Sequence, residues 1–472
     1  MSTPRSDSRK RATKIVATLG PATDGPGAIA RLLRAGVDVF RLNMSHGSQE
    51  EHGRRIAEIR AATTEAAILA DLQGPKIRLG RFEGGTAVLE TGAAFTITTE
   101  EMTGNQERAS TTYADFARDV KPGDTVLLAD GAVELRVLST DGVSVGCEVV
   151  SGGSIGDRKG INLPGVAVSS PSLTEKDRAD LAFCTERGVD LIALSFVRSG
   201  DDLQELRAAV PDGTPIVAKI EKPEGWRNLE SILDVADGIM VARGDLGVEM
   251  PLDELPYIQK SIIKAARRRG RFVITATQML ESMIENAAPT RAEVSDVANA
   301  IFDGSDAVML SGETSIGKYP EAAVEMMARI ALQAEAHREF GTWEDLHEKA
   351  HGCDPEIVAG AAYQCALAAG VRAIAVFTMS GSTARLISRL RPPVPVYAFT
   401  PSQEMARRLA VNHGVRPVVT PGLESTDEIF AQVNRVLKER NWARTGEAVV
   451  IVAGIPIGRP GSTNLLKVHR VA

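Results

Sequence analysis

This sequence contains few aromatic residues and few cysteines. Phe, Trp and Tyr make up 4% of its 472 residues, so the core must be built from Ala, Val, Leu and Ile. The four cysteines, Cys147, Cys184, Cys353 and Cys365, lie far apart and lack the paired spacing of zinc sites or disulfide scaffolds. We therefore expect them to be reduced residues in or near the core of a protein in a reducing compartment.

The sequence also lacks a long apolar run near its start and an excess of positive charge. The first dozen residues are polar and basic and no apolar run follows them, which argues against a secretory signal or a membrane span. The formal net charge of −7 argues against binding to nucleic acid or to an anionic membrane. These features together predict a cytoplasmic protein.

The main pattern present is a repeated unit in which an apolar run is followed by a stretch of helical period. Continuous apolar strands that alternate with helices indicate a parallel sheet covered on both faces. About eight such units match a (β/α)8 TIM barrel. The expected strands are residues 14–20, 37–47, 66–74, 190–197, 215–221, 238–246, 272–278 and 306–313.

Two segments depart from this rhythm. Residues 75–171 show short alternating runs with turn signals between them, which predicts an all-β domain inserted after the third barrel strand. This insertion leaves the barrel at the end where active sites lie, so it is placed to act as a lid. Residues 346–472 begin a second α/β pattern and form a predicted C-terminal domain, while residues 1–74 and 172–345 form the two parts of the barrel.

Charged and hydroxyl residues follow several of the expected barrel strands. Lys219 and Glu221 are two residues apart on one strand and project to the same side. Asp245, after the next strand, would complete an oxygen-ligand set suited to Mg²⁺. Lys219 and Glu221 alone would also fit a buried ion pair, but Arg41, Asp245, Thr277 and Ser311 at the other strand ends favour an active site.

The sequence resembles the pyruvate kinase family in motifs that run in order along the predicted barrel and its insertion. They lie at residues 14–21, 41–47, 71–78, 159–165, 218–225, 240–247, 276–280, 289–293 and 310–314. The resemblance implies phosphoryl transfer from phosphoenolpyruvate to ADP, which yields pyruvate and ATP in the last step of glycolysis. It also implies a homotetramer.

The resemblance further implies roles for individual residues. Glu221 and Asp245 would hold Mg²⁺ or Mn²⁺, while Lys219 and Arg41 would stabilise charge on the phosphoryl group in flight. Thr277 and Ser311 would hold the water through which the enolate is protonated, and which group relays the proton stays open. The expected substrate-binding residues are Arg41, Lys219, Gly244, Asp245 and Thr277, and the expected nucleotide-binding residues are Asn43, His46, Arg78 and Lys159.

One departure from the family pattern concerns a monovalent cation. Members that need K⁺ coordinate it at positions matching Asn43, Ser45, Asp71 and Leu72, and they carry glutamate where this chain has Lys76. A lysine ammonium at that place would supply the positive charge and repel a second cation. We therefore predict that the enzyme works without K⁺.

The predicted C-terminal domain contains a turn rich in hydroxyl groups and glycine. Such a turn binds phosphate through backbone amides and hydroxyls, although an ordinary helix cap would show the same residues. In the family this region binds a phosphorylated effector, and Met379 stands where some bisphosphate-activated members carry lysine. We expect a monophosphate such as AMP or a hexose phosphate. The expected effector residues are Thr378, Ser380, Gly381, Ser382 and Thr383.

Two other functions fit part of the pattern. A metal-dependent aldolase or lyase would also place Glu and Asp on adjacent barrel strands, but it has no use for a nucleotide-binding lid. A non-catalytic metabolite sensor would keep the fold and lose catalytic residues, yet Lys219, Glu221, Asp245, Thr277 and Arg41 are all present.

Overall fold

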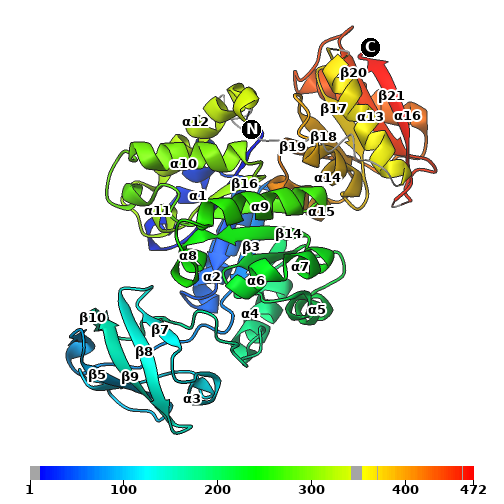
Figure 1. Ribbon diagram of the computed structural model, residues 1–472. Helices are drawn as coiled ribbons and strands as arrows, with labels where there is room; N and C mark the ends of the chain where they lie inside the picture. The colour runs from blue at the N-terminus through cyan, green and yellow to red at the C-terminus, as the bar shows by residue number, and fades with distance from the viewer. Residues whose placement is uncertain (1–10, 342–352, 369, 460) are drawn as a thin grey trace.

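The computed structural model describes residues 11–341, 353–368, 370–459 and 461–472. Its centre is a closed barrel of eight parallel strands in the order β1-β16-β15-β14-β13-β12-β3-β2 (Figure 1). The predicted fold class, a TIM barrel with an inserted all-β domain and a C-terminal α/β domain, is confirmed. Four parts of the chain lie outside the described residues: residues 1–10 and 342–345 of the expected barrel domain, and residues 346–352 together with residues 369 and 460 of the expected C-terminal domain.

The barrel strands form where the apolar runs predicted them, and both of their faces are buried. The strands are β1 (Lys14–Thr18), β2 (Val39–Asn43), β3 (Ala67–Leu72), β12 (Leu191–Leu194), β13 (Ile216–Ile220), β14 (Gly238–Ala242), β15 (Phe272–Ala276) and β16 (Ala307–Leu310). Side chains such as Val16, Leu69 and Ile274 fill the interior, whereas Ile15, Ile68 and Val273 pack against the surrounding helices. A strand buried on both faces is apolar throughout, which explains the continuous runs in the sequence.

Helices surround the barrel and begin at recognisable caps. Ser48 and Glu51 form a capping box at the start of α2, and Thr290 and Glu293 form another at the start of α10. The helices of this layer are α1 (Ala28–Ala35), α2 (Gln49–Ala62), α4 (Glu175–Glu186), α5 (Gly200–Ala209), α6 (Pro223–Arg227), α7 (Leu229–Val235), α8 (Arg243–Glu249), α9 (Leu255–Arg268), α10 (Arg291–Phe302), α11 (Gly312–Ser315) and α12 (Pro320–Ala336). No described helix is long and apolar enough to span a membrane.

The chain between β3 and α4 forms the inserted domain, called the lid below. Its main sheet has the order β11-β7-β8-β9-β5-β6, and β10 pairs with β4 separately. The elements are β4 (Thr86–Leu89), β5 (Ala94–Thr98), β6 (Arg108–Ser110), β7 (Thr125–Leu128), β8 (Val133–Thr140), β9 (Ser144–Ser151), β10 (Gly153–Gly156), β11 (Ile161–Asn162) and a short helix, α3 (Phe116–Asp119), which the sequence pattern did not predict. A separate apolar cluster that includes Phe95, Phe116 and Val137 forms the core of the lid.

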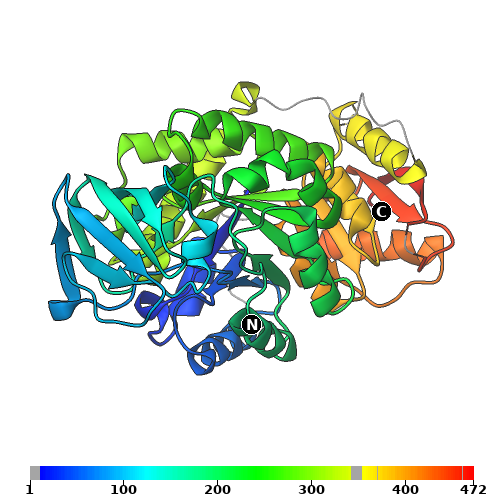
Figure 2. The same cartoon turned by 60° about the horizontal axis from the view of Figure 1, so that its bottom comes forward.

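The C-terminal domain is a five-stranded sheet in the order β19-β18-β17-β20-β21. Its elements are β17 (Ile374–Phe377), β18 (Val396–Thr400), β19 (Val415–Val419), β20 (Ala448–Gly454), β21 (Thr463–Arg470), α13 (Asp354–Ala368), α14 (Ser382–Arg389), α15 (Gln403–Arg408) and α16 (Thr426–Glu439). The antiparallel edge strand β21 was not predicted, because its mostly half-exposed side chains lack the continuous apolar run of the other strands. The lid and this domain lie at opposite ends of the barrel (Figures 1 and 2).

Candidate active site

The carboxyl end of β13 places a buried ammonium group inside a ring of oxygens. Lys219 Nζ lies 2.8 Å from Glu221 Oε1 and 3.2 Å from Asp71 Oδ1, and it donates a hydrogen bond of 2.7 Å to Ser195 Oγ. Lys219 and Glu221 thus face the same side of the strand. Both side chains are almost fully buried, so their mutual attraction is screened little by water.

The electrostatic surroundings keep Lys219 charged. Burial lowers the pKa of Lys219, but Asp71 and Glu221 outweigh this effect and raise it to about 12. Burial tends to raise the pKa of Asp71, but Lys219 and Arg41 hold it below its ordinary value. An ammonium held by two carboxylates stabilises negative charge and is poorly suited to act as a base.

Arg41, at the end of β2, shares Asp71 with Lys219. Its Nε donates to Asp71 Oδ2 at 2.7 Å, and its Nη1 donates to Thr18 Oγ1 at 3.0 Å. Arg41 is 7% exposed, and Asp71 is 1% exposed. Asp71 therefore fixes two cations beside each other at the mouth of the barrel.

The end of β12 supplies two residues that the sequence analysis missed. Ser195 Oγ accepts the Lys219 hydrogen bond and donates to the carbonyl oxygen of Leu72 at 2.7 Å. The backbone N–H of Phe196 donates to Glu221 Oε2 at 2.8 Å, and Phe196 has a φ of 57°. A large side chain seldom adopts this conformation, which is typical of functional sites. Both residues lie at the end of an expected barrel strand, and this position could have identified them as candidate site residues.

Helix α8 starts at the end of β14 and places Asp245 in its first turn. Arg243 anchors the helix: its guanidinium binds Asp296 at 2.7 Å and the carbonyl oxygen of Thr277 at 2.8 Å. The N–H of Gly244 donates to Thr277 Oγ1 at 2.7 Å, so the glycine amide and the threonine hydroxyl meet directly. Thr277 itself has a φ of 65°. Gly244, Asp245 and Thr277 therefore form one side of the site.

Ser311 closes the set at the end of β16. Its N–H donates to Glu313 Oε2 at 2.7 Å, which fixes the backbone. Its Oγ is buried and has no hydrogen-bond partner among the described residues. A buried hydroxyl without a partner is costly in a protein interior, so Ser311 Oγ is suited to binding a ligand or a water molecule.

The expected nucleotide residues carry a concentration of positive charge. Partial burial, together with the charges of Arg78, Lys76 and Arg41, lowers the pKa of His46. Arg78 Nη1 is held by the carbonyl oxygen of Arg158 at 3.0 Å, next to the exposed side chain of Lys159 in the lid. A neutral imidazole beside several cations is suited to contact an anionic nucleotide.

The structure shows the contacts and the burial of the residues of the expected monovalent-cation site. Asn43 Oδ1 accepts the N–H of Ser45 at 3.2 Å, and the side chain of Leu72 is fully buried. Lys76 is half-buried, and its Cε atom lies beside Gly160 of the lid. The positive charge of Lys76 also contributes to lowering the pKa of His46, which directly follows Ser45 in the chain.

The effector residues border a pocket of about 180 Å³ in the C-terminal domain. Thr378, Ser380, Ser382 and Thr383 line it, whereas Gly381 is not among its lining residues. The N–H of Gly381 donates to Thr378 Oγ1 at 2.9 Å, which shapes the turn before α14. Arg459, Ser462 and Met379 also line the pocket, so it combines one arginine with several hydroxyl groups.

The two carboxylates at the ends of β13 and β14 fit a divalent cation. Burial raises the pKa of Glu221, and the charge of Asp245 acts in the same direction, although Lys219 opposes both. Two carboxylates that repel each other are stabilised by a cation between them, and Mg²⁺ uses one or two carboxylates together with substrate oxygens. Among the described residues no group of three or more His, Cys, Asp or Glu side chains that could hold a metal ion occurs.

Comparisons with known proteins point to a single family. Residues 10–324 match the family model described as the barrel domain of pyruvate kinase, and residues 356–469 match its alpha/beta domain. The chain is 45% identical over 467 residues to a pyruvate kinase of Corynebacterium efficiens, and the match covers 98% of each chain. It is 46% identical over 468 residues to a pyruvate kinase of Mycobacterium tuberculosis, again with 98% of each chain covered. A solved pyruvate kinase from Cryptosporidium parvum is similar in structure, with a TM-score of 0.93 and 37% identity over 99% of this chain and 98% of that one.

Proposed function

The chain belongs to the pyruvate kinase family, and on this premise we propose how its residues carry out the reaction of that family. It is a phosphotransferase that converts phosphoenolpyruvate and ADP to pyruvate and ATP. Lys219 supports the assignment of roles most directly, since it is a buried permanent cation held between Glu221 and Asp71 at the barrel mouth.

Lys219 and Arg41 stabilise the negative charge that develops on the transferred phosphoryl group. Their positions are fixed before substrate binds, because Asp71 contacts both of them. Charges that need no rearrangement during the reaction contribute most to lowering the barrier. Glu221 and Asp245 would hold Mg²⁺ or Mn²⁺, which supplies additional positive charge for the phosphoryl oxygens when it is bound.

Gly244, Asp245 and Thr277 orient the carboxylate side of phosphoenolpyruvate. The Gly244 amide is bonded to Thr277 Oγ1, so a substrate carboxylate would take this N–H and release the threonine hydroxyl. Thr277 and Ser311 then hold the water that protonates the enolate, with the unpartnered Ser311 Oγ as one contact. His46, Asn43, Arg78 and Lys159 bind the nucleotide through their positive charge and polar groups.

The activity is tested by a lactate dehydrogenase-coupled assay with phosphoenolpyruvate, ADP and Mg²⁺. Removal of divalent cations with a chelator should abolish turnover, and Mg²⁺ or Mn²⁺ should restore it. Turnover that persists without any divalent cation would contradict the roles of Glu221 and Asp245.

We also propose that turnover does not depend on K⁺. In support, the charge of Lys76 contributes to lowering the pKa of His46, the residue that follows Ser45 of the expected cation site. Turnover in K⁺ should match turnover in tetramethylammonium at equal ionic strength, and strong activation by K⁺ would refute this.

A phosphorylated effector is proposed for the pocket in the C-terminal domain. Its hydroxyl groups and Arg459 suit a phosphate, and Met379, in place of the lysine of some bisphosphate-activated members, favours a monophosphate. AMP and hexose phosphates should shift the phosphoenolpyruvate saturation curve of the wild type, and Arg459→Ala should weaken the shift. An unchanged curve with every compound would refute this proposal.

A homotetramer in the cytoplasm is proposed from family membership. Sedimentation analysis should give four times the chain mass of 50.3 kDa. A mass of one or two chains over the concentration range of the activity assay would contradict it.

A further inference from the structure

Glu249, the last residue of α8, connects three parts of the active-site region. Its Oε1 accepts a hydrogen bond of 3.1 Å from Asn162 Nδ2 in the lid and lies 3.2 Å from Lys222 Nζ. Lys222 directly follows Glu221, and Asp245 lies one helical turn before Glu249. The Glu249 carboxylate thus joins both proposed metal-binding segments to the lid.

The surroundings of Glu249 distinguish it from an ordinary surface ion pair. Its side chain is 2% exposed, and that of Lys222 is 13% exposed. Both contacts fall on Oε1, while Oε2 is buried without a partner among the described residues. A buried carboxylate with one unused oxygen has room to exchange or gain a donor when the lid moves.

The lid touches the barrel at the same helix through a second contact. A Cβ at Gly131 would lie 3.8 Å from Val248 Cγ1, so the lid loop at Gly131 packs beside α8. The strand that contains Asn162, β11, follows Lys159 by two residues and pairs with β7 next to this loop. Asn162 therefore lies close to Lys159 in the chain, at a place where the lid meets α8.

We propose that Glu249 is a positioning residue that sets the orientation of the lid through Asn162. By holding β11 against α8, it fixes Lys159 relative to Glu221 and Asp245. The consequence of Glu249 for catalysis rests on the proposed contact of Lys159 with the nucleotide. On this basis, loss of the Glu249–Asn162 contact should affect the KM for ADP more than the KM for phosphoenolpyruvate.

Exchange of the two groups tests this contact. Asn162→Asp places two carboxylates opposite each other and should raise the KM for ADP about tenfold, with a change of less than about twofold in the KM for phosphoenolpyruvate. The double variant Asn162→Asp/Glu249→Gln exchanges amide and carboxylate and should restore the KM for ADP to within about threefold of the wild type. An equal rise in both KM values, or no rescue in the double variant, would overturn the proposal.

Asp303 provides a matched control. Its buried carboxylate also contacts one lysine, Lys260, and one side-chain amide, Gln259 Nε2 at 3.0 Å, but it lies at the end of α10 away from the lid. Asp303→Asn should lower thermal stability without changing the ratio of the two KM values. A change of that ratio as large as in Asn162→Asp would overturn the proposal.

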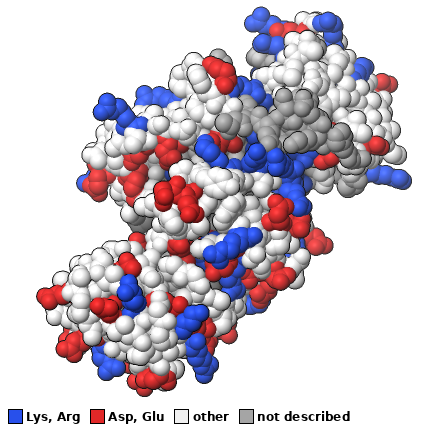
Figure 3. Space-filling view, viewed as in Figure 1, with Lys and Arg blue, Asp and Glu red and all other residues white. Residues whose placement is uncertain are grey.

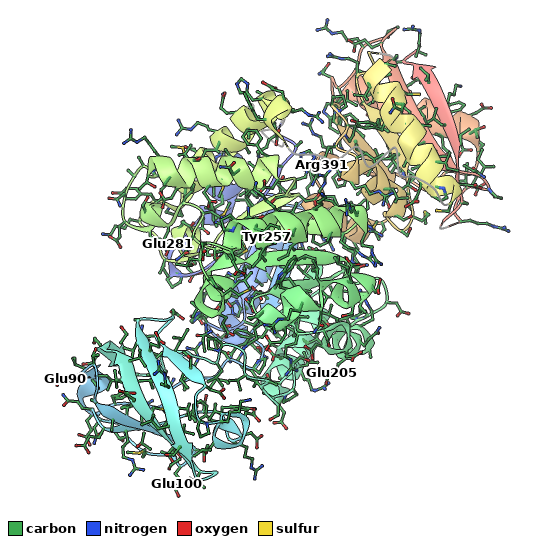
Figure 4. The ribbon with its side chains drawn as sticks, in the orientation of Figure 1. Glu90, Glu100, Glu205, Tyr257, Glu281 and Arg391 are labelled. Atoms are coloured by element: carbon green, nitrogen blue, oxygen red, sulfur yellow. The ribbon has the colours of Figure 1, made fainter. Side chains whose placement is uncertain are left out.

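The lid orientation is measured separately from activity. Spin labels attached at position 100 in the lid and position 204 on α5 report the distance between the lid and the barrel. The labelled protein carries serine in place of Cys353 and Cys365. Figure 4 names Glu100 and Glu205, which show the two regions. Asn162→Asp should broaden or shift the distance distribution, and the double variant should reverse the change. An unchanged distribution in Asn162→Asp would overturn the proposal.

Lys159→Ala tests the proposed contact of Lys159 with the nucleotide by itself. An unchanged KM for ADP in this variant would refute that contact, whereas the distances between the spin labels would still decide the role of Glu249.

Discussion

At the scale of single residues, Asp71 is as important to the site as the residues that would touch substrate. It binds Arg41 Nε at 2.7 Å and lies 3.2 Å from Lys219 Nζ, and it is itself almost completely buried. Two cations close together repel each other, and a shared carboxylate removes that cost. The arrangement supplies a fixed positive field without requiring either cation to lose its proton.

Replacement of Lys219 tests this field. Lys219→Met keeps the length of the side chain but removes the charge, and we expect kcat to fall by at least about 100–1000-fold. The KM for phosphoenolpyruvate should change much less, because the charge matters most in the transition state. Steady-state kinetics measure both values, and circular dichroism checks the fold. A kcat within about tenfold of the wild type would show that Lys219 has a structural role only.

Lys76 is the residue that should determine the cation requirement. Lys76→Glu introduces the glutamate that the family resemblance associates with a need for K⁺ and removes the positive charge that we propose takes the place of K⁺. We expect the variant to lose at least about tenfold in turnover in tetramethylammonium and to recover part of it in K⁺, because K⁺ then replaces the ammonium group. Low activity that K⁺ leaves unchanged would argue against this exchange of charges.

At the scale of elements, the start of α4 links both ends of the lid to the barrel. Asp177 accepts the N–H of Thr174 at 3.0 Å as part of a capping box, and it also accepts the N–H of Gly74 at 3.1 Å. Gly74 lies where the chain leaves the barrel for the lid, and Thr174 lies where it has returned. One helix cap thus fixes the separation of the two connections.

Asp177→Ala should therefore cost more than an ordinary cap. It leaves buried backbone donors without acceptors, and we expect the free energy of unfolding to fall by about 2–3 kcal/mol. Thr290→Ala, at the capping box of α10 far from the lid, should cost about 1 kcal/mol. Thermal unfolding followed by calorimetry compares them. Equal losses in the two variants would show that Asp177 does no more than cap α4.

At the scale of the whole molecule, the amino end of the barrel is joined to the C-terminal domain by buried charges. Arg391, 1% exposed, binds Asp306 Oδ1 at 2.8 Å, and the N–H of His413 donates to the same oxygen at 3.1 Å (Figure 4). Asp190 in the barrel likewise binds Arg407 Nε at 2.7 Å. On the face shown in Figure 3 acidic and basic side chains are interspersed, whereas these pairs lie between the two domains.

Breaking the Arg391–Asp306 pair should destabilise the molecule strongly. Arg391→Met leaves Asp306 buried without its charged partner, and we expect a loss of about 3–5 kcal/mol. Arg31→Met removes an exposed pair with Glu321 and should cost less than about 1 kcal/mol. Calorimetry of both variants measures the difference. A loss below about 1 kcal/mol for Arg391→Met would mean that the pair contributes little to joining the domains.

The same junction should make stability dependent on pH. Burial, and the charges of Arg391, Lys14, Arg338 and Arg267, lower the pKa of His413 well below 6.5. Below pH 6.5 the unfolded chain therefore binds a proton that the folded chain excludes, and stability falls as the pH decreases. His413→Gln should reduce this slope by up to about 1.4 kcal/mol per pH unit below pH 6. Urea denaturation between pH 5 and 8 tests it, and an unchanged slope would contradict it.

The sequence by itself determined the barrel, the inserted domain and the strand ends from which the candidate site is built. Apolar runs predict parallel strands, and parallel strands bring their carboxyl ends together, so Lys219, Glu221, Asp245 and Arg41 could be grouped before any contact was known. Strand β21 could not be predicted in this way, because an exposed edge strand needs no continuous apolar run.

Only the tertiary structure decided how those residues are held. Asn162 and Glu249 are 87 residues apart in sequence, and Arg391 and Asp306 are 85 apart, yet each pair is in contact. Phe196, Ser195 and Asp177 likewise act on groups in other elements. Sequence periodicity indicates which face of an element is buried, but it does not indicate which other element packs against that face. Those partners fix Lys219 between Asp71 and Glu221 and the lid against α8.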